Sequence, residues 1–223
     1  MTGSAEVIVV GSGPAGVAAA CAAADNGANV TLVEAHSFPG GELVSGLPVD
    51  GCLNARGQWL VGGPAQALFQ GCRRRGGYIG PLFDRRLNWG VCIDPVAMRL
   101  SIVEELTCRR VRLMLGSIVH NAAVRDGRIT TIDVVQRQGR VQLMANVFVD
   151  ASGDGTLAVL AGTEYEQSEG IRGNQGHIYT KYNCLDGWGA CEVKEGHNMP
   201  RTHQSGRRVV SRDRPREQQA GDL

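Results

Sequence analysis

The hydrophobic pattern of the first 34 residues predicts a strand, a helix and a second strand in direct succession. Residues 7–10 form an unbroken apolar run, which is typical of a strand buried on both faces. The small residues of 15–24 predict a helix that lies close to a sheet, and Gly27 suits the left-handed position that ends a helix. Residues 29–33 predict the next strand, so the stretch is a βαβ unit.

The pattern is less regular between residues 35 and 91. Residues 35–63 are rich in glycine and lack a clean period, but their interspersed apolar side chains favour an ordered loop. Pro64 is expected to open a helix that runs to about residue 75. The arginines at 73–75 are expected to interact with the negative end of that helix rather than to bind a substrate. Residues 76–91 are expected to form a second loop.

A third helix is predicted to start with Asp94 as its N-cap and Pro95 as its first residue. Apolar side chains recur along it at helical spacing. We expect this stripe to face the core, and it comprises Val96, Leu100, Val103 and Leu106.

From residue 111 the apolar period changes to that of strands. Asp126-Gly127, between two β-rich runs, is a strong hairpin signal. The pattern predicts a three-stranded antiparallel meander over about residues 111–144. A further apolar strand at residues 147–149 and a short helix at residues 156–161 are expected to follow it.

Three glycines after the first strand have the spacing G-x-G-x-x-G. Gly11 allows a sharp turn, Gly13 allows the backbone to approach a pyrophosphate, and Gly16 allows the helix to lie close to the sheet. Glu34 ends the second strand 18 residues after Gly16, near the offset at which an acid binds ribose hydroxyls. A βαβ unit whose glycines serve packing alone would leave Glu34 unexplained, so the sequence predicts a dinucleotide site.

Composition restricts the functional class only in part. The 223 residues suffice for one large domain or two small ones, and the net charge of +1 gives no reason to expect a nucleic acid or a membrane surface as partner. No signal peptide or membrane-spanning segment is recognisable. The seven cysteines are odd in number and scattered, without a C-x-x-C pair, which favours reduced thiols and a cytoplasmic location.

Three segments resemble the FAD-dependent oxidoreductase family of the glutathione-reductase-like flavoproteins. They are the N-terminal glycine motif, the loop at residues 38–57, and residues 147–162, which are similar to the second flavin-domain motif A-T-G-D. The resemblance covers about residues 6–166. It implies an α/β fold in which residues 1–166 form a Rossmann-like FAD-binding domain with a parallel sheet and an inserted antiparallel β-meander.

The resemblance also implies which positions hold FAD. The main chain of the first turn would bind the pyrophosphate, Glu34 the adenosine ribose, and the strand around Val119 the adenine edge. A second glycine turn would close over the cofactor, with Ser152 where the family usually has threonine. The implied cofactor-binding residues are Gly11, Ser12, Gly13, Pro14, Ala15, Gly16, Glu34, Gly40, Gly41, Val119, Ala151, Ser152 and Gly153.

The roles of a few neighbouring residues stay open at this stage. Asp154 either faces the cofactor or caps the helix that starts at Thr156, and capping is the favoured interpretation. Cys52, Asn54 and Arg56 either line the flavin face or have core and surface roles.

The family pattern ends before the chain does. Relatives are longer and return to a C-terminal flavin segment, so the resemblance implies a truncated form. Residues 167–223 lack sustained periodicity and are expected to form an irregular, poorly ordered tail. The histidines and cysteines of this tail are spaced too widely for a structural zinc site, so no metal is expected.

The resemblance therefore implies an oxidoreductase that transfers hydride or electrons through FAD, acting on a small molecule of unknown identity. No catalytic residue is identifiable, because His36 and His120 have no partner in a motif. Two alternatives stay open. One is a non-catalytic nucleotide-binding fragment, and the other is an NAD-dependent enzyme, since Glu34 suits NAD as well as FAD.

Overall fold

The computed structural model describes residues 2–84 and 88–164, and residues 1–164 form one compact unit. The expectations for residues 167–223, including the irregular tail and its histidines and cysteines, lie outside the described residues. In the described part, no helix is long and apolar enough to cross a membrane. The same residues contain no cluster of three or more side chains that suits a metal ion.

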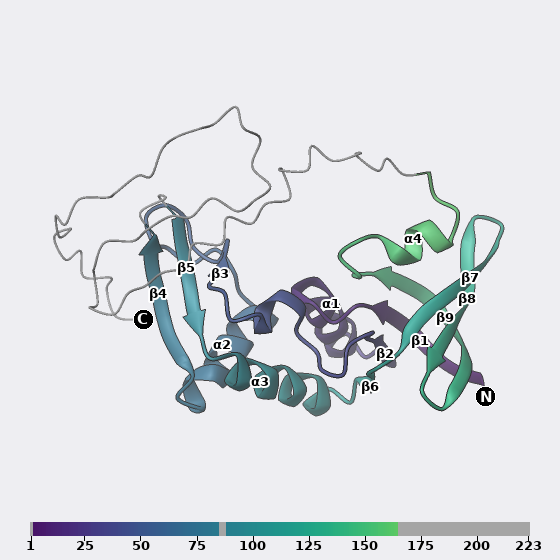
Figure 1. The fold of residues 1–223 in the computed structure, drawn as a ribbon, viewed down its shortest axis with the longest axis horizontal. Coiled ribbons are helices and arrows are strands. Elements are labelled where there is room, and N and C mark those ends of the chain that lie inside the picture. Colours follow the sequence, from purple (N-terminus) through teal and green to yellow (C-terminus); the bar gives the residue numbers. More distant parts are fainter. Residues whose placement is uncertain (1, 85–87, 165–223) are drawn as a thin grey trace, which may run out of the picture. The chain divides into compact units, whose positions relative to one another are not determined.

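A mixed six-stranded sheet carries the N-terminal βαβ unit (Figure 1). β1 lies in its middle, parallel to β2 on one side and to β9 on the other, and β6 extends the parallel part beyond β2. The strand order is β6 (Arg112–Met114), β2 (Val30–Val33), β1 (Thr2–Val10), β9 (Gly139–Asp150), β8 (Arg128–Gln136) and β7 (Ile118–Arg125).

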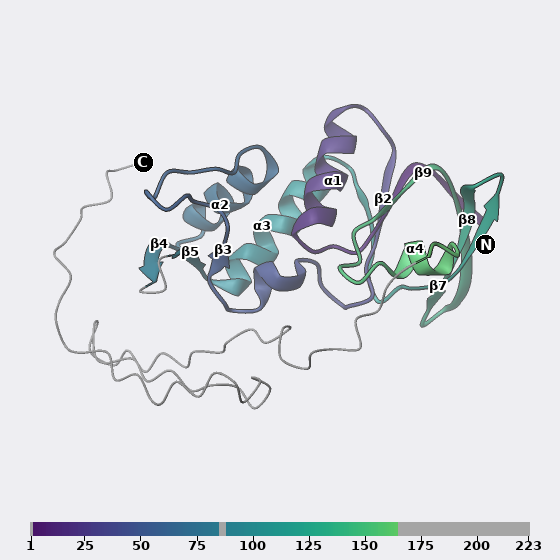
Figure 2. The ribbon, with the colours of Figure 1, turned by 90° about the horizontal axis from the view of Figure 1, so that it is seen from above.

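Both faces of β1 are buried, as its apolar run predicts. Val9 belongs to the core beneath α1 (Pro14–Asp25), whereas Ile8 and Val10 belong to a second core with β8, β9 and α4 (Thr156–Leu160). Figure 2 shows α1 on one side of the sheet and α4 beside the β7–β9 strands on the other. The carboxyl end of β1 is therefore enclosed between two layers.

The β-meander is confirmed, but its predicted limits were wrong. β6 pairs only with β2 and belongs to the parallel part of the sheet, whereas β7, β8 and β9 form the antiparallel meander. β9 runs without a break from Gly139 to Asp150, so one strand serves both the meander and the parallel pairing with β1. The hairpin signal was right, because Asp126 and Gly127 both adopt positive φ, at 50° and 72°.

A second sheet occupies a stretch that the sequence predicted to be a loop. It is antiparallel, in the order β3 (Val49–Asp50), β5 (Asn88–Ile93) and β4 (Tyr78–Asp84). The prediction of a loop at residues 76–91 was wrong because Gly80 and Pro81 interrupt the strand pattern. β4 lies at the edge of this sheet and has a bulge between Tyr78 and Gly80, a setting in which a strand tolerates proline.

Helices α2 (Pro64–Arg74) and α3 (Pro95–Cys108) are where the sequence predicts them, and the Asp94 side chain accepts a hydrogen bond from the Ala97 N–H (2.8 Å). The predicted core stripe of α3 was wrong except for Leu106: Val96, Leu100 and Val103 are 60%, 52% and 40% exposed. The buried face is rotated toward Ala97, Met98, Ser101, Ile102 and Leu106.

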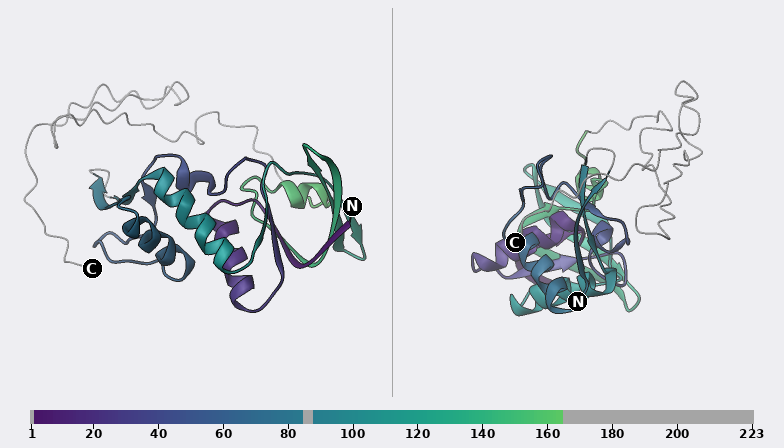
Figure 3. Two further views of the ribbon diagram at one scale, coloured as in Figure 1. Left: turned by 90° about the horizontal axis from the view of Figure 1, so that it is seen from below. Right: turned by 90° about the vertical axis from the view of Figure 1, so that its left-hand side faces the viewer.

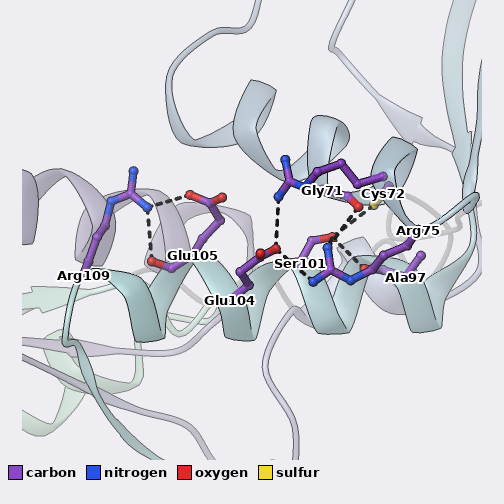
Figure 4. Close-up of polar contacts among 9 residues, drawn as sticks. Gly71, Cys72, Arg75, Ala97, Ser101, Glu104, Glu105 and Arg109 are labelled. Atoms are coloured by element: carbon purple, nitrogen blue, oxygen red, sulfur yellow. Dashed lines mark hydrogen bonds and ion pairs between the residues drawn. The ribbon is translucent and has the colours of Figure 1, made fainter.

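The inner face of α3 is set by close contact with α2. A Cβ atom on Gly71 would lie only 2.6 Å from the Ser101 Oγ, so glycine lets the two helices approach. Figure 4 shows Arg75 beside Gly71 and Glu104; Arg75 donates to the Gly71 carbonyl oxygen (3.0 Å) and to Glu104 (2.9 Å). Arg74 also donates to Glu104, at 3.0 Å. These arginines join α2 to α3 as well as meeting a helix end. Figure 3 shows α3, in teal, running between the two sheets.

Candidate functional site: a dinucleotide cradle

The first glycine turn connects β1 directly to α1. Gly11 has φ +94°, and a Cβ atom there would overlap the main chain of Ala151, on the neighbouring turn after β9. A Cβ atom on Gly16 would overlap the carbonyl oxygen of Gly11. Glycine is therefore required at both positions by backbone contacts inside the protein.

Gly13 differs from these two glycines because it faces open space. It is the N-cap of α1, and a Cβ atom built there has no neighbour within 4 Å. Pro14 and Ala15, the first residues of α1, are exposed. The unpaired N–H groups at this helix start, together with the helix dipole, favour an anion in that space.

Ser12 and Glu34 join the first turn to the end of β2. The Ser12 N–H and hydroxyl both donate to Glu34 Oε2, at 2.8 and 2.5 Å, and both residues are buried. The His36 N–H donates to Glu34 Oε1 at 2.7 Å, and the His36 ring Nδ1 lies 2.8 Å from the same oxygen. Burial alone would raise the Glu34 pKa, but these hydrogen bonds hold the pKa below its ordinary value.

The Glu34 carboxylate is therefore at the expected place but already accepts from protein donors. A carboxylate has about four lone-pair positions, and the contacts to Ser12 and His36 use them. The His36 side chain is 76% exposed, so its ring is the partner that a ribose hydroxyl would most easily displace. His36 has no motif partner in the sequence, yet the fold gives it a specific one.

The loop after β2 returns to the first turn. The Gly40 N–H donates to the Ser12 carbonyl oxygen at 2.9 Å, and a Cβ atom on Gly41 would lie 2.9 Å from the Gly13 Cα. Gly40 and Gly41 both have positive φ, +127° and +50°. A short 3-10 helix, η1 (Gly41–Val44), follows. Gly40 and Gly41 are thus brought to the same cradle as Gly13.

The second glycine turn leaves the end of β9 beside the first. The Ala151 N–H donates to the Val10 carbonyl oxygen at 2.8 Å, which ties the two turns together. Asp150 Oδ1 accepts from the Ser152 N–H (3.1 Å) and hydroxyl (2.7 Å), while Oδ2 accepts from the Ala158 N–H (2.9 Å) on α4. Burial raises the Asp150 pKa, but hydrogen bonds, that of the Ser152 hydroxyl foremost, leave it below the ordinary value.

Asp150 was missed at the sequence level as a residue that shapes this turn. The signal for it is an acid at the carboxyl end of a buried strand followed two residues later by serine, the arrangement of an Asx turn. Asp154 behaves as the favoured interpretation predicts: its Oδ1 accepts from the Thr156 N–H (3.0 Å) and hydroxyl (2.6 Å) at the start of α4. Gly153, at φ +86°, has no neighbour within 4 Å of a Cβ position.

The remaining candidates divide between the site and the core. Val119 is buried in β7, and the Ser117 N–H just before it donates to the Glu34 carbonyl oxygen at 2.9 Å. Cys52 is a buried core residue. Asn54 Oδ1 accepts from the main-chain N–H of Arg56 (2.9 Å) and thereby stabilises its own turn, while Arg56 is exposed. The fold thus gives Cys52 and Asn54 structural roles.

A glycine turn at a helix start, an acid at the end of the next strand, and a second turn from a parallel neighbouring strand define a dinucleotide-binding α/β protein. The chain belongs to the FAD dependent oxidoreductase family, whose model matches residues 6–221. FAD is accordingly its cofactor. The finer placement among glutathione-reductase-like flavoproteins stays a prediction.

Solved structures share this fold at low sequence identity. The anhydrotetracycline hydroxylase OxyS from Streptomyces rimosus matches with a TM-score of 0.53 and 17% identity over 74% of this chain and 35% of its own. A flavoprotein/dehydrogenase from Cytophaga hutchinsonii matches with a TM-score of 0.53 and 17% identity, over 74% of this chain and 44% of its own. A geranylgeranyl bacteriochlorophyll reductase-like protein from Thermoplasma acidophilum matches with a TM-score of 0.52 and 15% identity, over 74% of this chain and 43% of its own. The chain therefore spans less than half of each structure. No curated protein matches.

The residues present fit FAD on the structure's own terms. Gly13 leaves room for a pyrophosphate in front of the α1 N-terminus, and Gly153 leaves room on the second turn. Glu34 lies within the same hydrogen-bonded unit through Ser12. A long dinucleotide can therefore contact the main chain of both glycine turns and the Glu34 carboxylate at the end of β2.

Proposed function

We propose that this chain supplies the FAD-binding part of an oxidoreductase that moves hydride or electrons between FAD and a small-molecule substrate. Bound FAD supplies the redox chemistry, and the protein supplies binding, orientation and exclusion of water. The observation that carries the proposal is the pair of glycine turns after β1 and β9. The two turns are joined by the Ala151–Val10 hydrogen bond, and each is held by a carboxylate through a serine.

Each part of the cradle has a separate task in this proposal. The main chain from Ser12 to Ala15 and the loop at Gly40 and Gly41 bind the pyrophosphate, and Glu34 accepts from the adenosine ribose. The main chain near Val119 meets the adenine edge. The turn of Ala151, Ser152 and Gly153 covers the cofactor from the other side. Ser12 acts from beneath the turn, because its hydroxyl is committed to Glu34.

A non-catalytic nucleotide-binding role is the second candidate. It is favoured by what the acidic groups of the cradle do. In residues 2–84 and 88–164 the titratable groups of the cradle hold backbone in place, and none of them is a free acid or base beside the expected flavin position.

The absorption spectrum of the purified chain tests both candidates. We expect flavin bands in the visible range. Heating should release about one FAD per chain, as a single site requires. Turnover with an artificial electron acceptor would support the oxidoreductase. Bound FAD that is reduced only by a chemical reductant such as dithionite, and by no small-molecule substrate, would support the binding role. A colourless protein that takes up no added FAD, while its circular dichroism is that of a folded α/β protein, would contradict both.

We also propose a cytoplasmic location and no nucleic-acid or membrane partner. In the described part of the chain, five cysteines are free thiols, and burial raises the pKa of Cys21, Cys52 and Cys72. Buried, protonated thiols persist in a reducing compartment. Fractionation of cells that express the chain, followed by thiol titration, tests this location.

A further inference from the structure

Arg99 on α3 has a guanidinium nitrogen that is buried without a hydrogen-bond partner among the described residues. Its Nε is buried and makes no hydrogen bond, and its Cζ lies 3.8 Å from the centroid of the Phe38 ring. Within residues 2–84 and 88–164, no carboxylate or carbonyl oxygen engages this guanidinium. Buried donors on charged groups normally have an acceptor, so this arrangement calls for one.

The position of Arg99 connects it to the cradle. Phe38 belongs to the loop whose Gly40 N–H donates to the Ser12 carbonyl oxygen (2.9 Å). Ile102 lies one turn after Arg99 on the same face of α3, and a Cβ atom on Gly40 would be 3.1 Å from the Ile102 Cδ1. α3 therefore supports the loop that forms one wall of the cradle, and Arg99 lies on that support.

The negative charges of the cradle favour a cation nearby. Its carboxylates are Glu34, Asp150 and Asp154, whereas α1 has only the partial positive charge of its N-terminus and no basic residue in its first turn. An FAD pyrophosphate would add further negative charge to this region. A guanidinium held beside the adjoining loop offsets that repulsion and offers paired N–H donors to phosphate oxygens.

We propose that Arg99 binds the pyrophosphate of FAD, with the Phe38 ring holding the guanidinium plane in place. This inference rests on the proposed function, because it assigns a further residue to the same cofactor site. It goes beyond the glycine motifs, which contribute only main-chain groups and a partial dipole. Arg99 is a binding residue in this proposal and takes no part in the redox step.

Titration of the apoprotein with FAD tests the role of Arg99. Arg99→Gln should weaken FAD binding about 10- to 100-fold, the range for losing a hydrogen bond between charged groups. Arg99→Lys should fall between this variant and the parent, since lysine keeps the charge but lacks the planar fork. Arg128→Gln is the matched control, because Arg128 is exposed at the start of β8 in the β7–β8 hairpin and its loss changes the net charge equally.

Competition separates a phosphate contact from a structural role. ADP and adenosine are used to displace FAD from the parent and from Arg99→Gln. We expect the substitution to lower the affinity for ADP by the same factor as the affinity for FAD and to leave the affinity for adenosine unchanged. Loss of ADP and adenosine binding together would mean that Arg99 only supports the fold, and FAD affinity equal to the control would also overturn the inference. If the parent itself binds no FAD, the proposed function fails instead.

Discussion

The two glycine turns of the cradle look alike in sequence but use their glycines differently. In the first turn, Gly11 and Gly16 are required because any Cβ atom would overlap protein backbone. In the second turn, Gly153 and Gly155 have no neighbour within 4 Å and are required only by their positive φ, +86° and +73°. The first turn is thus defined by packing and the second by local backbone conformation.

The two turns share one device, a serine that donates twice to a strand-end carboxylate. Ser12 and Glu34 are buried, whereas Ser152 is partly buried and Asp150 is exposed. Hydrogen bonds in a buried setting are screened less by water. We therefore expect changes in the first turn to cost more stability than the matching changes in the second.

The largest effect is expected from Gly16→Ala. The added methyl group would overlap the Gly11 carbonyl oxygen, which cannot move without separating α1 from β1. We expect a loss of about 3 kcal/mol or more in the free energy of unfolding, together with loss of FAD binding. Denaturant titration measures it, and a variant as stable as the parent would contradict the packing role of the first turn.

Gly13→Val should abolish FAD binding without a comparable loss of stability. The position is open in the protein, so a branched side chain there meets the pyrophosphate rather than the backbone. Loss of a good helix cap should cost about 1 kcal/mol of stability or less. Flavin fluorescence titration gives the affinity and thermal melting the stability. Undiminished FAD binding would place the cofactor elsewhere.

Glu34→Gln should cost roughly 1 to 3 kcal/mol, both in stability and in FAD affinity, because buried donors of Ser12 lose a charged acceptor. The folded Glu34 has a lowered pKa, so its contribution is complete above the unfolded pKa and is lost as the pH falls through the folded value. The difference in melting temperature between parent and variant should therefore shrink from about pH 5 downward. A difference that grows in acid would contradict this assignment.

Asp150→Asn provides the matched change in the second turn. Its carboxylate also has a lowered pKa, so the acid dependence should have the same sign. Because Asp150 is exposed to solvent, we expect a smaller cost in stability, about 1 kcal/mol. Parallel melting curves of the two variants across pH test the comparison directly. Equal losses would show that burial does not distinguish the turns.

Gly153→Ala should have the smallest effect. A Cβ atom meets nothing there, and the cost is that of a positive φ, about 1 kcal/mol. Gly27→Ala is a matched control, with φ +87° and no neighbour within 4 Å at the end of α1, away from the cradle. Similar losses of stability in both, with weaker FAD binding only for Gly153→Ala, would support the second turn as a cofactor wall.

Local patterns in the sequence determined much of this protein. The run before Gly11, the glycine spacing, and Glu34 predicted the βαβ unit because each depends on neighbours within about 30 residues. The caps Asp94 and Pro95 and the Asp126-Gly127 turn were equally local, and all are confirmed. The family resemblance located the second turn before its partners could be seen.

Only the tertiary structure decided the features that depend on distant partners. The period of α3 allows two apolar faces, and close contact with Gly71 of α2 selects the face that is buried. Gly80 and Pro81 argue against a strand, and only the pairing of β4 with β5 makes residues 78–84 one. Ser12 and Glu34 act together because the fold brings the Ser12 donors within hydrogen-bond distance of a carboxylate 22 residues away. The sequence gives the polar and apolar groups that are present, but burial and pairing between distant segments decide which of these groups are in contact.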